Sequence, residues 1–167
     1  RDAKILTIYE GTTAIQANDL VGRKTARDGG QTAKGIAAQV AETEAALVAS
    51  GSAQALAVAK RLKAAREAFL DVVDFVAGKT KAEPNAVFAG SVPYLMLAGN
   101  LVAGWQLARS LRVAEEQLAA GVDTAFMQAK IATAHFYAEH LLNKAPGIRD
   151  SIVDGAASVT ALALESF

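Results

Sequence analysis

The sequence predicts an all-α protein, an antiparallel helical bundle of about five to six helices. Hydrophobic residues make up 52% of the chain and charged residues only 20%, a composition that favours a buried core. Apolar residues recur at three- and four-residue steps, whereas no stretch alternates with period two for long enough to predict a strand. Gly- and Pro-containing turns separate the helical stretches, and 167 residues are enough for one ordinary domain.

The first expected helix follows the apolar segment of residues 1–10. Gly11 interrupts that segment, and Thr12 or Thr13 can serve as an N-cap by accepting a hydrogen bond from a free backbone amide. A helix is therefore expected from about Ala14 to Ala26. It should stop at the Asp28-Gly29-Gly30 sequence, because glycine readily adopts the left-handed conformation that ends helices.

Two further helices are expected at residues 32–49 and 53–77, separated by Ser50-Gly51-Ser52. The second of them has the clearest amphipathic pattern of the chain, with charged residues on the face opposite the apolar one. Its apolar positions are Leu62, Ala65, Phe69, Val72, Val73 and Val76. This helix should lie in the core of the bundle.

The C-terminal half predicts three more helical stretches. The first covers residues 85–118, and Pro93 should end, kink or restart it because proline has no amide to donate. Asp123 is the expected N-cap of a helix over residues 124–142, which Pro146-Gly147 should end. A last helix of about 17 residues is expected to reach the C-terminus.

Composition excludes several kinds of protein. Seventeen basic residues balance seventeen acidic ones, so nothing in the net charge indicates nucleic acid as a partner. The chain has no Cys, which excludes disulfides and thiolate chemistry and is compatible with a cytoplasmic location. The most apolar run, residues 92–105, is too short for a membrane span. Because the chain does not begin with Met, we expect its natural N-terminal neighbour to be missing.

One candidate for chemistry stands at the start of the chain. Glu10 precedes Gly11 and a helix start, where free amides and the helix dipole favour an anion. Position alone leaves two interpretations open: an ordinary charged residue near a helix N-terminus, or a carboxylate that faces a ligand pocket and acts as a general base.

Residues 1–16 closely resemble the C-terminal signature of acyl-CoA dehydrogenases, R-D-A-[KR]-I-x-x-I-Y-E-G-T-x-x-I-Q, with agreement at about a dozen positions and no gap. Residues 17–24, 129–134 and 136–142 resemble a subgroup of long bacterial enzymes that carry an additional C-terminal helical domain. The resemblance implies that residues 1–30 end the dehydrogenase C-terminal domain and that residues 31–167 form the additional bundle packed with it.

The family resemblance assigns roles to residues of this segment. Glu10 would be the base that removes the α-proton of an acyl-CoA thioester, while a hydride leaves the β-carbon for FAD and a 2-enoyl-CoA forms. Tyr9 and Gly11 would line the acyl-CoA side. The residues that would face FAD are Thr12, Thr13, Ala14 and Gln16, with Ala14 contributing only its backbone and packing.

The resemblance also implies partners for the chain. These are the missing N-terminal and middle domains of the same protein, the acyl-CoA substrate, a second copy in a homodimer, and an electron-transfer flavoprotein. Without the missing domains, the isolated chain is expected to lack FAD and to be inactive. The alternative is a non-catalytic helical module for dimerisation or interaction.

Other candidates favour structural roles. His135 and Glu139 share a helix face and could serve a metal, but a surface ion pair or a hydrogen-bonded histidine is the preferred interpretation, so no metal site is predicted. The basic cluster of Lys60, Arg61, Lys63 and Arg66 could receive CoA phosphates or an acidic partner, and is preferred as a solvated helix face. Trp105 is expected in the core or an interface.

Overall fold

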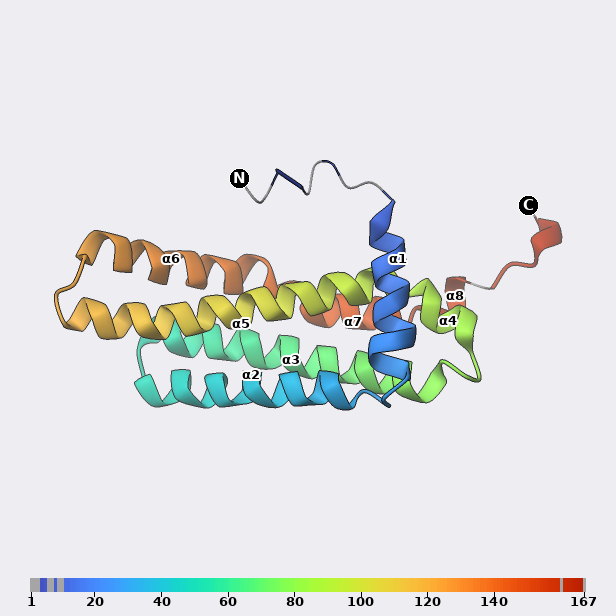
Figure 1. Cartoon of the computed structure of the whole chain (residues 1–167), viewed down its shortest axis with the longest axis horizontal. Helices are drawn as coiled ribbons and strands as arrows, with labels where there is room; N and C mark the ends of the chain where they lie inside the picture. The colour runs from blue at the N-terminus through green and yellow to red at the C-terminus, as the bar shows by residue number, and fades with distance from the viewer. Residues whose placement is uncertain (1–3, 6–7, 9–10, 160, 167) are drawn as a thin grey trace.

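The structure is a computed structural model that describes residues 4–5, 8, 11–159 and 161–166 of the chain (Figure 1). The described residues contain helices and no strands, which confirms the predicted all-α bundle. None of these helices is long and apolar enough to cross a membrane. The long helices lie along the longest axis of the molecule and are α2 (Gln31–Ser50), α3 (Ala53–Lys79), α5 (Ser91–Ala119) and α6 (Thr124–His140).

Helix α3 is the central element of the bundle. It contacts α2, α5 and α6 as well as α7 (Ala145–Val153), which runs beside it beyond the end of α6. Its buried positions follow the predicted apolar stripe and are Ala55, Val58, Ala59, Leu62, Ala65, Ala68, Phe69, Val72, Val73 and Val76. Many of them are Ala or Val, and small side chains let neighbouring helices approach closely.

The first helix lies across the bundle instead of along it (Figure 1). Helix α1 (Thr12–Asp19) runs directly into a π-helix, η2 (Leu20–Ala26). The sequence predicted one helix over this region with the correct end but not the π-helical half. The predicted Thr caps were wrong: Gly11 is the N-cap, with φ 74° and ψ −4°, so both threonines lie inside the first turn.

The turn after η2 forms as its sequence predicts. Gly29 and Gly30 both have positive φ, and the Gly30 amide donates to the Thr25 carbonyl at 2.8 Å. The Asp28 carboxylate accepts from the Gly30 amide and from the Thr32 amide, each at 2.9 Å. A Cβ on Gly30 would lie 2.6 Å from Val73 Cγ1, so a side chain here would also push the turn away from α3.

Pro93 and Pro146 both lie at the start of a helix, which agrees with the expectation that Pro93 restarts a helix and contradicts the one for Pro146. Pro93 lies in the first turn of α5, after the short helix α4 (Pro84–Ala89) and Gly90. The prediction that Pro146-Gly147 ends a helix was wrong, because Pro146 lies at the start of α7, where the missing amide has no partner to lose.

The predicted last helix is divided into shorter pieces. Helix α6 stops at His140 and a 3₁₀ turn, η3 (Leu142–Lys144), leads into α7. After α7 come α8 (Ala156–Val159) and the 3₁₀ turn η4 (Leu164–Ser166). Gly155 lies at the break after α7: a Cβ there would be 2.6 Å from the Ser151 carbonyl oxygen.

Candidate functional site

Some of the predicted site residues lie before α1 and others lie at its start. Tyr9 and Glu10, the predicted substrate contact and the predicted base, lie outside the described residues. Gly11 and the four residues predicted to face FAD are described, and they form the cap and first turns of α1. Among the described residues, no side chain caps this helix, so the backbone amides of its first turn offer donors for a further polar group.

Helix α1 presents these residues to the outside of the bundle. Thr12 is half-buried, and Thr13, Ala14 and Gln16 are exposed. Ile15 beside them is 66% exposed, a large fraction for an aliphatic side chain on a helix. The end of α1 that carries them points away from the bundle in Figure 1, so the described bundle leaves this segment uncovered.

The C-terminal part of α1 and η2 is buried against the bundle. Ala17, Val21 and Thr25 are buried at four-residue intervals along α1 and η2. Thr25 Oγ1 and Tyr94 Oη form a buried hydrogen bond of 2.9 Å, which links η2 to α5. Burial raises the pKa of the Tyr94 phenol above its usual value, although the hydrogen bond with Thr25 partly opposes this.

The turn that follows carries a stabilised carboxylate. Hydrogen bonds from the Thr32 hydroxyl and amide hold the pKa of Asp28 below its usual value. The carboxylate stays ionised and continues to cap the start of α2 at neutral pH. Together, the Thr25–Tyr94 bond and this cap fix the C-terminal side of η2.

A groove of about 1170 Å³ opens at the opposite end of the bundle, near the α5–α6 turn. Its base contains small apolar residues such as Ala46, Ala49 and Ala132, and Arg112 and His135 contribute charged or titratable groups. None of the described site residues, which are Gly11, Thr12, Thr13, Ala14 and Gln16, lines it. The groove is therefore separate from the segment at the start of α1.

The basic cluster of α3 is divided between structural ion pairs and solvent. Arg61 forms a bidentate contact with Glu139 of α6, in which Nη2 lies 2.8 Å from Oε2. Arg66 forms the same kind of contact with Glu44 of α2. The hydrogen bonds that the two arginines donate to these carboxylates raise the pKa of both guanidinium groups. Lys60 and Lys63 are exposed. The two arginines thus serve the bundle and are not available to CoA phosphates.

Glu139, the carboxylate of the His135–Glu139 pair, is bound by Arg61. The Arg61 hydrogen bonds lower the pKa of Glu139, and the charge of His135 contributes less. Since Arg61 occupies both oxygens, Glu139 is committed to the α3–α6 contact. In the described ranges, no three His, Cys, Asp or Glu side chains come together as metal ligands.

Comparison with known proteins identifies the chain. The family described as acetyl-CoA dehydrogenase C-terminal like matches residues 32–163, well over half of the sequence. The chain belongs to this family. The matched range extends from the start of α2 beyond α8, so the bundle is this C-terminal-like domain.

Three relatives are dehydrogenases of acyl-CoA thioesters. A 3-methylmercaptopropionyl-CoA dehydrogenase of Ruegeria pomeroyi is 49% identical over 98% of this chain. A broad-specificity linear acyl-CoA dehydrogenase of Mycobacterium tuberculosis is 35% identical over 91%, and a butyryl-CoA dehydrogenase of Syntrophomonas wolfei is 29% identical over 89%. The chain spans only 28%, 26% and 24% of these relatives.

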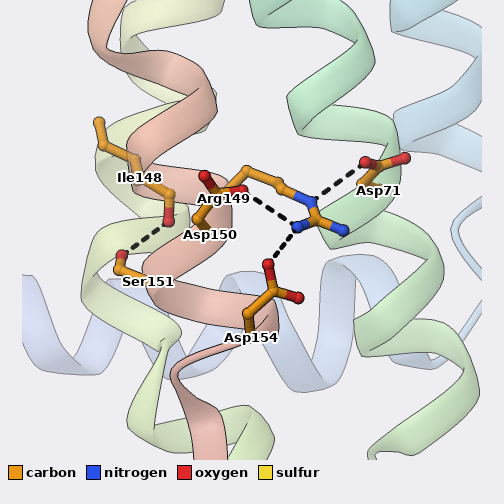
Figure 2. Close-up of polar contacts among 6 residues, drawn as sticks. All are labelled: Asp71, Ile148, Arg149, Asp150, Ser151 and Asp154. Atoms are coloured by element: carbon orange, nitrogen blue, oxygen red, sulfur yellow. Dashed lines mark hydrogen bonds and ion pairs between the residues drawn. The ribbon is translucent and has the colours of Figure 1, made fainter.

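Within the C-terminal-like domain, Arg149 fixes α7 against α3 (Figure 2). Its Nε donates to Asp71 on α3 at 3.1 Å, and its Nη1 donates to Asp150 at 3.0 Å and Asp154 at 2.6 Å. The Asp150 hydrogen bond is the main cause that raises the pKa of Arg149. One cation therefore joins three carboxylates across two helices.

The sequence interpretation did not find this network or the Thr25–Tyr94 bond. Asp150 and Asp154 lie one and five residues after Arg149, whereas helix periodicity predicts contacts at three and four residues, so their spacing was no usable signal. Asp71 lies 78 residues away, and Tyr94 lies 69 residues from Thr25. Only the packing of helices brings these residues together.

Proposed function

We propose that this chain is the C-terminal part of an FAD-dependent acyl-CoA dehydrogenase and that Glu10 is its catalytic base. The observation that carries the proposal is the 49% identity to a 3-methylmercaptopropionyl-CoA dehydrogenase over 98% of this chain, because that range includes the Tyr9-Glu10-Gly11-Thr12 segment. The substrate class we propose is an acyl-CoA thioester, which the names of the relatives share.

The reaction needs a carboxylate that removes a very weakly acidic proton. Glu10 would take the pro-R proton from the α-carbon of the thioester, and the electron pair of that C–H bond would form the α–β double bond. FAD, when bound, accepts the hydride that leaves the β-carbon, so the product is a trans-2-enoyl-CoA. A pocket that excludes water would raise the basicity of Glu10, which would have to lie within reach of the α-proton.

The residues at the start of α1 suit a role beside a bound cofactor. Thr12, Thr13 and Gln16 carry polar groups, Ala14 offers its backbone, and no side chain within the described residues caps the first turn. A helix N-terminus with free amides favours anionic or polar groups. Tyr9 and Gly11 would lie on the acyl-CoA side of the same segment.

The rest of the site would come from outside this chain. The exposed start of α1 supports contact with the N-terminal and middle domains of a longer protein, and the chain's 28% share of its relative supports their existence. We propose that residues 1–30 complete the catalytic domain and that residues 31–167 form an additional helical bundle beside it. The isolated chain would then bind no FAD and turn over no substrate.

We also propose a role for the bundle surface in assembly. Phe126 and Phe136 of α6 are 51% and 58% exposed, which favours a homodimer or another interaction surface on this helix. This role agrees with the absence of predicted catalytic residues after position 16. The assembly role of the bundle would complement the catalytic role of residues 1–16. We propose that an electron-transfer flavoprotein accepts electrons from the assembled enzyme.

The test is Glu10→Gln in the full-length dehydrogenase. The variant should retain bound FAD, seen from its visible absorbance, and lose the bleaching of the flavin that acyl-CoA causes in the parent enzyme. Glu42→Gln, an exposed carboxylate on α2, is the matched control and should bleach normally. Undiminished bleaching by Glu10→Gln would remove Glu10 from the role of base.

A further inference from the structure

The joint between α1 and the bundle is a π-helix. Its seven residues, Leu20–Ala26, continue α1 without a break. π-Helices are rare and short, and they commonly occur at functional sites. In an α-helix, a residue lies slightly past one full turn from the residue four positions before it. A π-helix has more residues per turn, so the same residue lies slightly short of one full turn. The change of helix type at Leu20 therefore keeps Ala17, Val21 and Thr25 on one buried side.

A hydrogen bond between two buried hydroxyls joins this π-helix to the core. Thr25 and Tyr94 are each 1% exposed, and their oxygens lie 2.9 Å apart. Thr25 is 69 residues from Tyr94 in sequence, so the bond is a tertiary contact between η2 and α5. Removal of either hydroxyl would leave the other buried without this partner, which is energetically unfavourable.

The direction of helix α1 depends on its packing against α5 and on its connection to η2. Ala17 is its one buried residue within the described range, and no side chain caps its start. It contacts α5 along one side and continues directly into η2. Any rotation or loosening of η2 would therefore be transmitted to the start of α1, where Gly11 and Thr12 lie.

We propose that Thr25 and Tyr94 are positioning residues, whose hydrogen bond fixes the π-helix and thereby the place of Gly11 and Thr12, the residues that follow Glu10 in the chain. The structural part of this proposal concerns the described helices alone. Its catalytic consequence rests on the proposed function, because only a dehydrogenase would need Glu10 at a defined distance from a substrate carbon. Misplacement of a catalytic group by about 1 Å can cost about a hundredfold in rate.

Hydrogen–deuterium exchange on the 167-residue chain tests the structural part. Thr25→Val and Tyr94→Phe should each raise exchange over residues 12–26 by more than tenfold and leave α2, α3 and α6 unchanged. Thr25→Ser keeps the hydroxyl and should exchange like the parent. Tyr137→Phe is the control, since it removes a tyrosine hydroxyl that donates to the Asn100 carbonyl at 3.3 Å. Unchanged exchange over residues 12–26, or an equal rise in every helix, would overturn the proposal.

Kinetics of the full-length dehydrogenase test the catalytic consequence. Thr25→Val and Tyr94→Phe should lower kcat about tenfold at an unchanged KM, while Thr25→Ser and Tyr137→Phe should keep the parent kcat. A kcat equal to that of the parent in both hydroxyl deletions would overturn the positioning role. The exchange result does not depend on Glu10. If Glu10→Gln still bleaches, the proposed function is rejected, and the exchange data alone then decide whether the Thr25–Tyr94 bond fixes the π-helix.

Discussion

Arg66 of α3 and Glu44 of α2 form a bidentate ion pair inside the bundle. Their two hydrogen bonds measure 2.7 Å and 3.0 Å, and the side chains are only 17% and 10% exposed. The geometry matches the planar fork of a guanidinium to the two oxygens of one carboxylate. The pair fixes the register of α2 on α3, the two helices that follow the candidate site in the chain.

Glu44→Gln should destabilise the chain by about 2 kcal/mol, because it leaves the largely buried Arg66 without its counter-charge. Urea unfolding measures this free energy, with fluorescence of Trp105 as the signal. Trp105 is the single tryptophan, and its indole nitrogen donates to Thr43 on α2 at 2.7 Å.

The matched control for this change is Glu67→Gln. Glu67 lies 3.9 Å from Lys63 and both side chains are exposed, so its loss should cost below about 0.5 kcal/mol. Equal costs for the two substitutions would mean that burial does not distinguish these ion pairs. The double variant Glu44→Leu, Arg66→Met should be closer to the parent than Glu44→Gln alone.

Gly104→Ala should destabilise the chain by about 1 kcal/mol, although alanine is the better helix former. A Cβ on Gly104 would lie 2.6 Å from Leu142 Cδ1 and 2.9 Å from Leu142 Cγ, and Leu142 is itself buried. Gly99→Ala on the same helix meets no atom within 4 Å and should stabilise by about 0.5–1 kcal/mol. The melting temperature should therefore fall for Gly104→Ala and rise for Gly99→Ala. A higher melting temperature for Gly104→Ala would show that Leu142 moves aside freely.

Glu139 should contribute to stability at neutral pH and lose that contribution in acid. Hydrogen bonds from Arg61 hold the pKa of Glu139 below its unfolded value, about 4.3 for a free glutamate. A lowered folded pKa means that the stabilisation is present above about pH 4.3 and disappears as pH falls through the folded pKa. The difference in melting temperature between the parent and Glu139→Gln should therefore shrink as pH falls below about 4.3. A difference that stays constant over this range would contradict the assignment.

Arg149→Met should loosen α7 by removing the cation between Asp71, Asp150 and Asp154. The remaining carboxylates would repel one another only weakly, because they are exposed to solvent. Limited proteolysis between α7 and α8 should become faster than in the parent. Arg112→Met removes an exposed arginine that lies 3.7 Å from Glu116, and it should leave the cleavage rate unchanged.

Local sequence signals determined much of this architecture. The apolar repeat of α3, the glycines after Asp28 and the Asp123 cap follow from interactions between residues a few positions apart. The same locality explains the errors. Pro146 resembles a helix end because its sequence neighbours do not reveal that a new helix begins there. Gly11 is the cap in place of the threonines because its left-handed conformation depends on the folded turn.

The starting segment shows where sequence and tertiary structure contribute differently. The sequence by itself determined the all-α class, and its linear motif is what predicts a catalytic segment within residues 1–16. Only the tertiary structure decided that α1 crosses the bundle, that η2 is a π-helix and that Thr25 reaches Tyr94. Those features depend on contacts between residues distant in the chain, and helix periodicity carries no information about such partners.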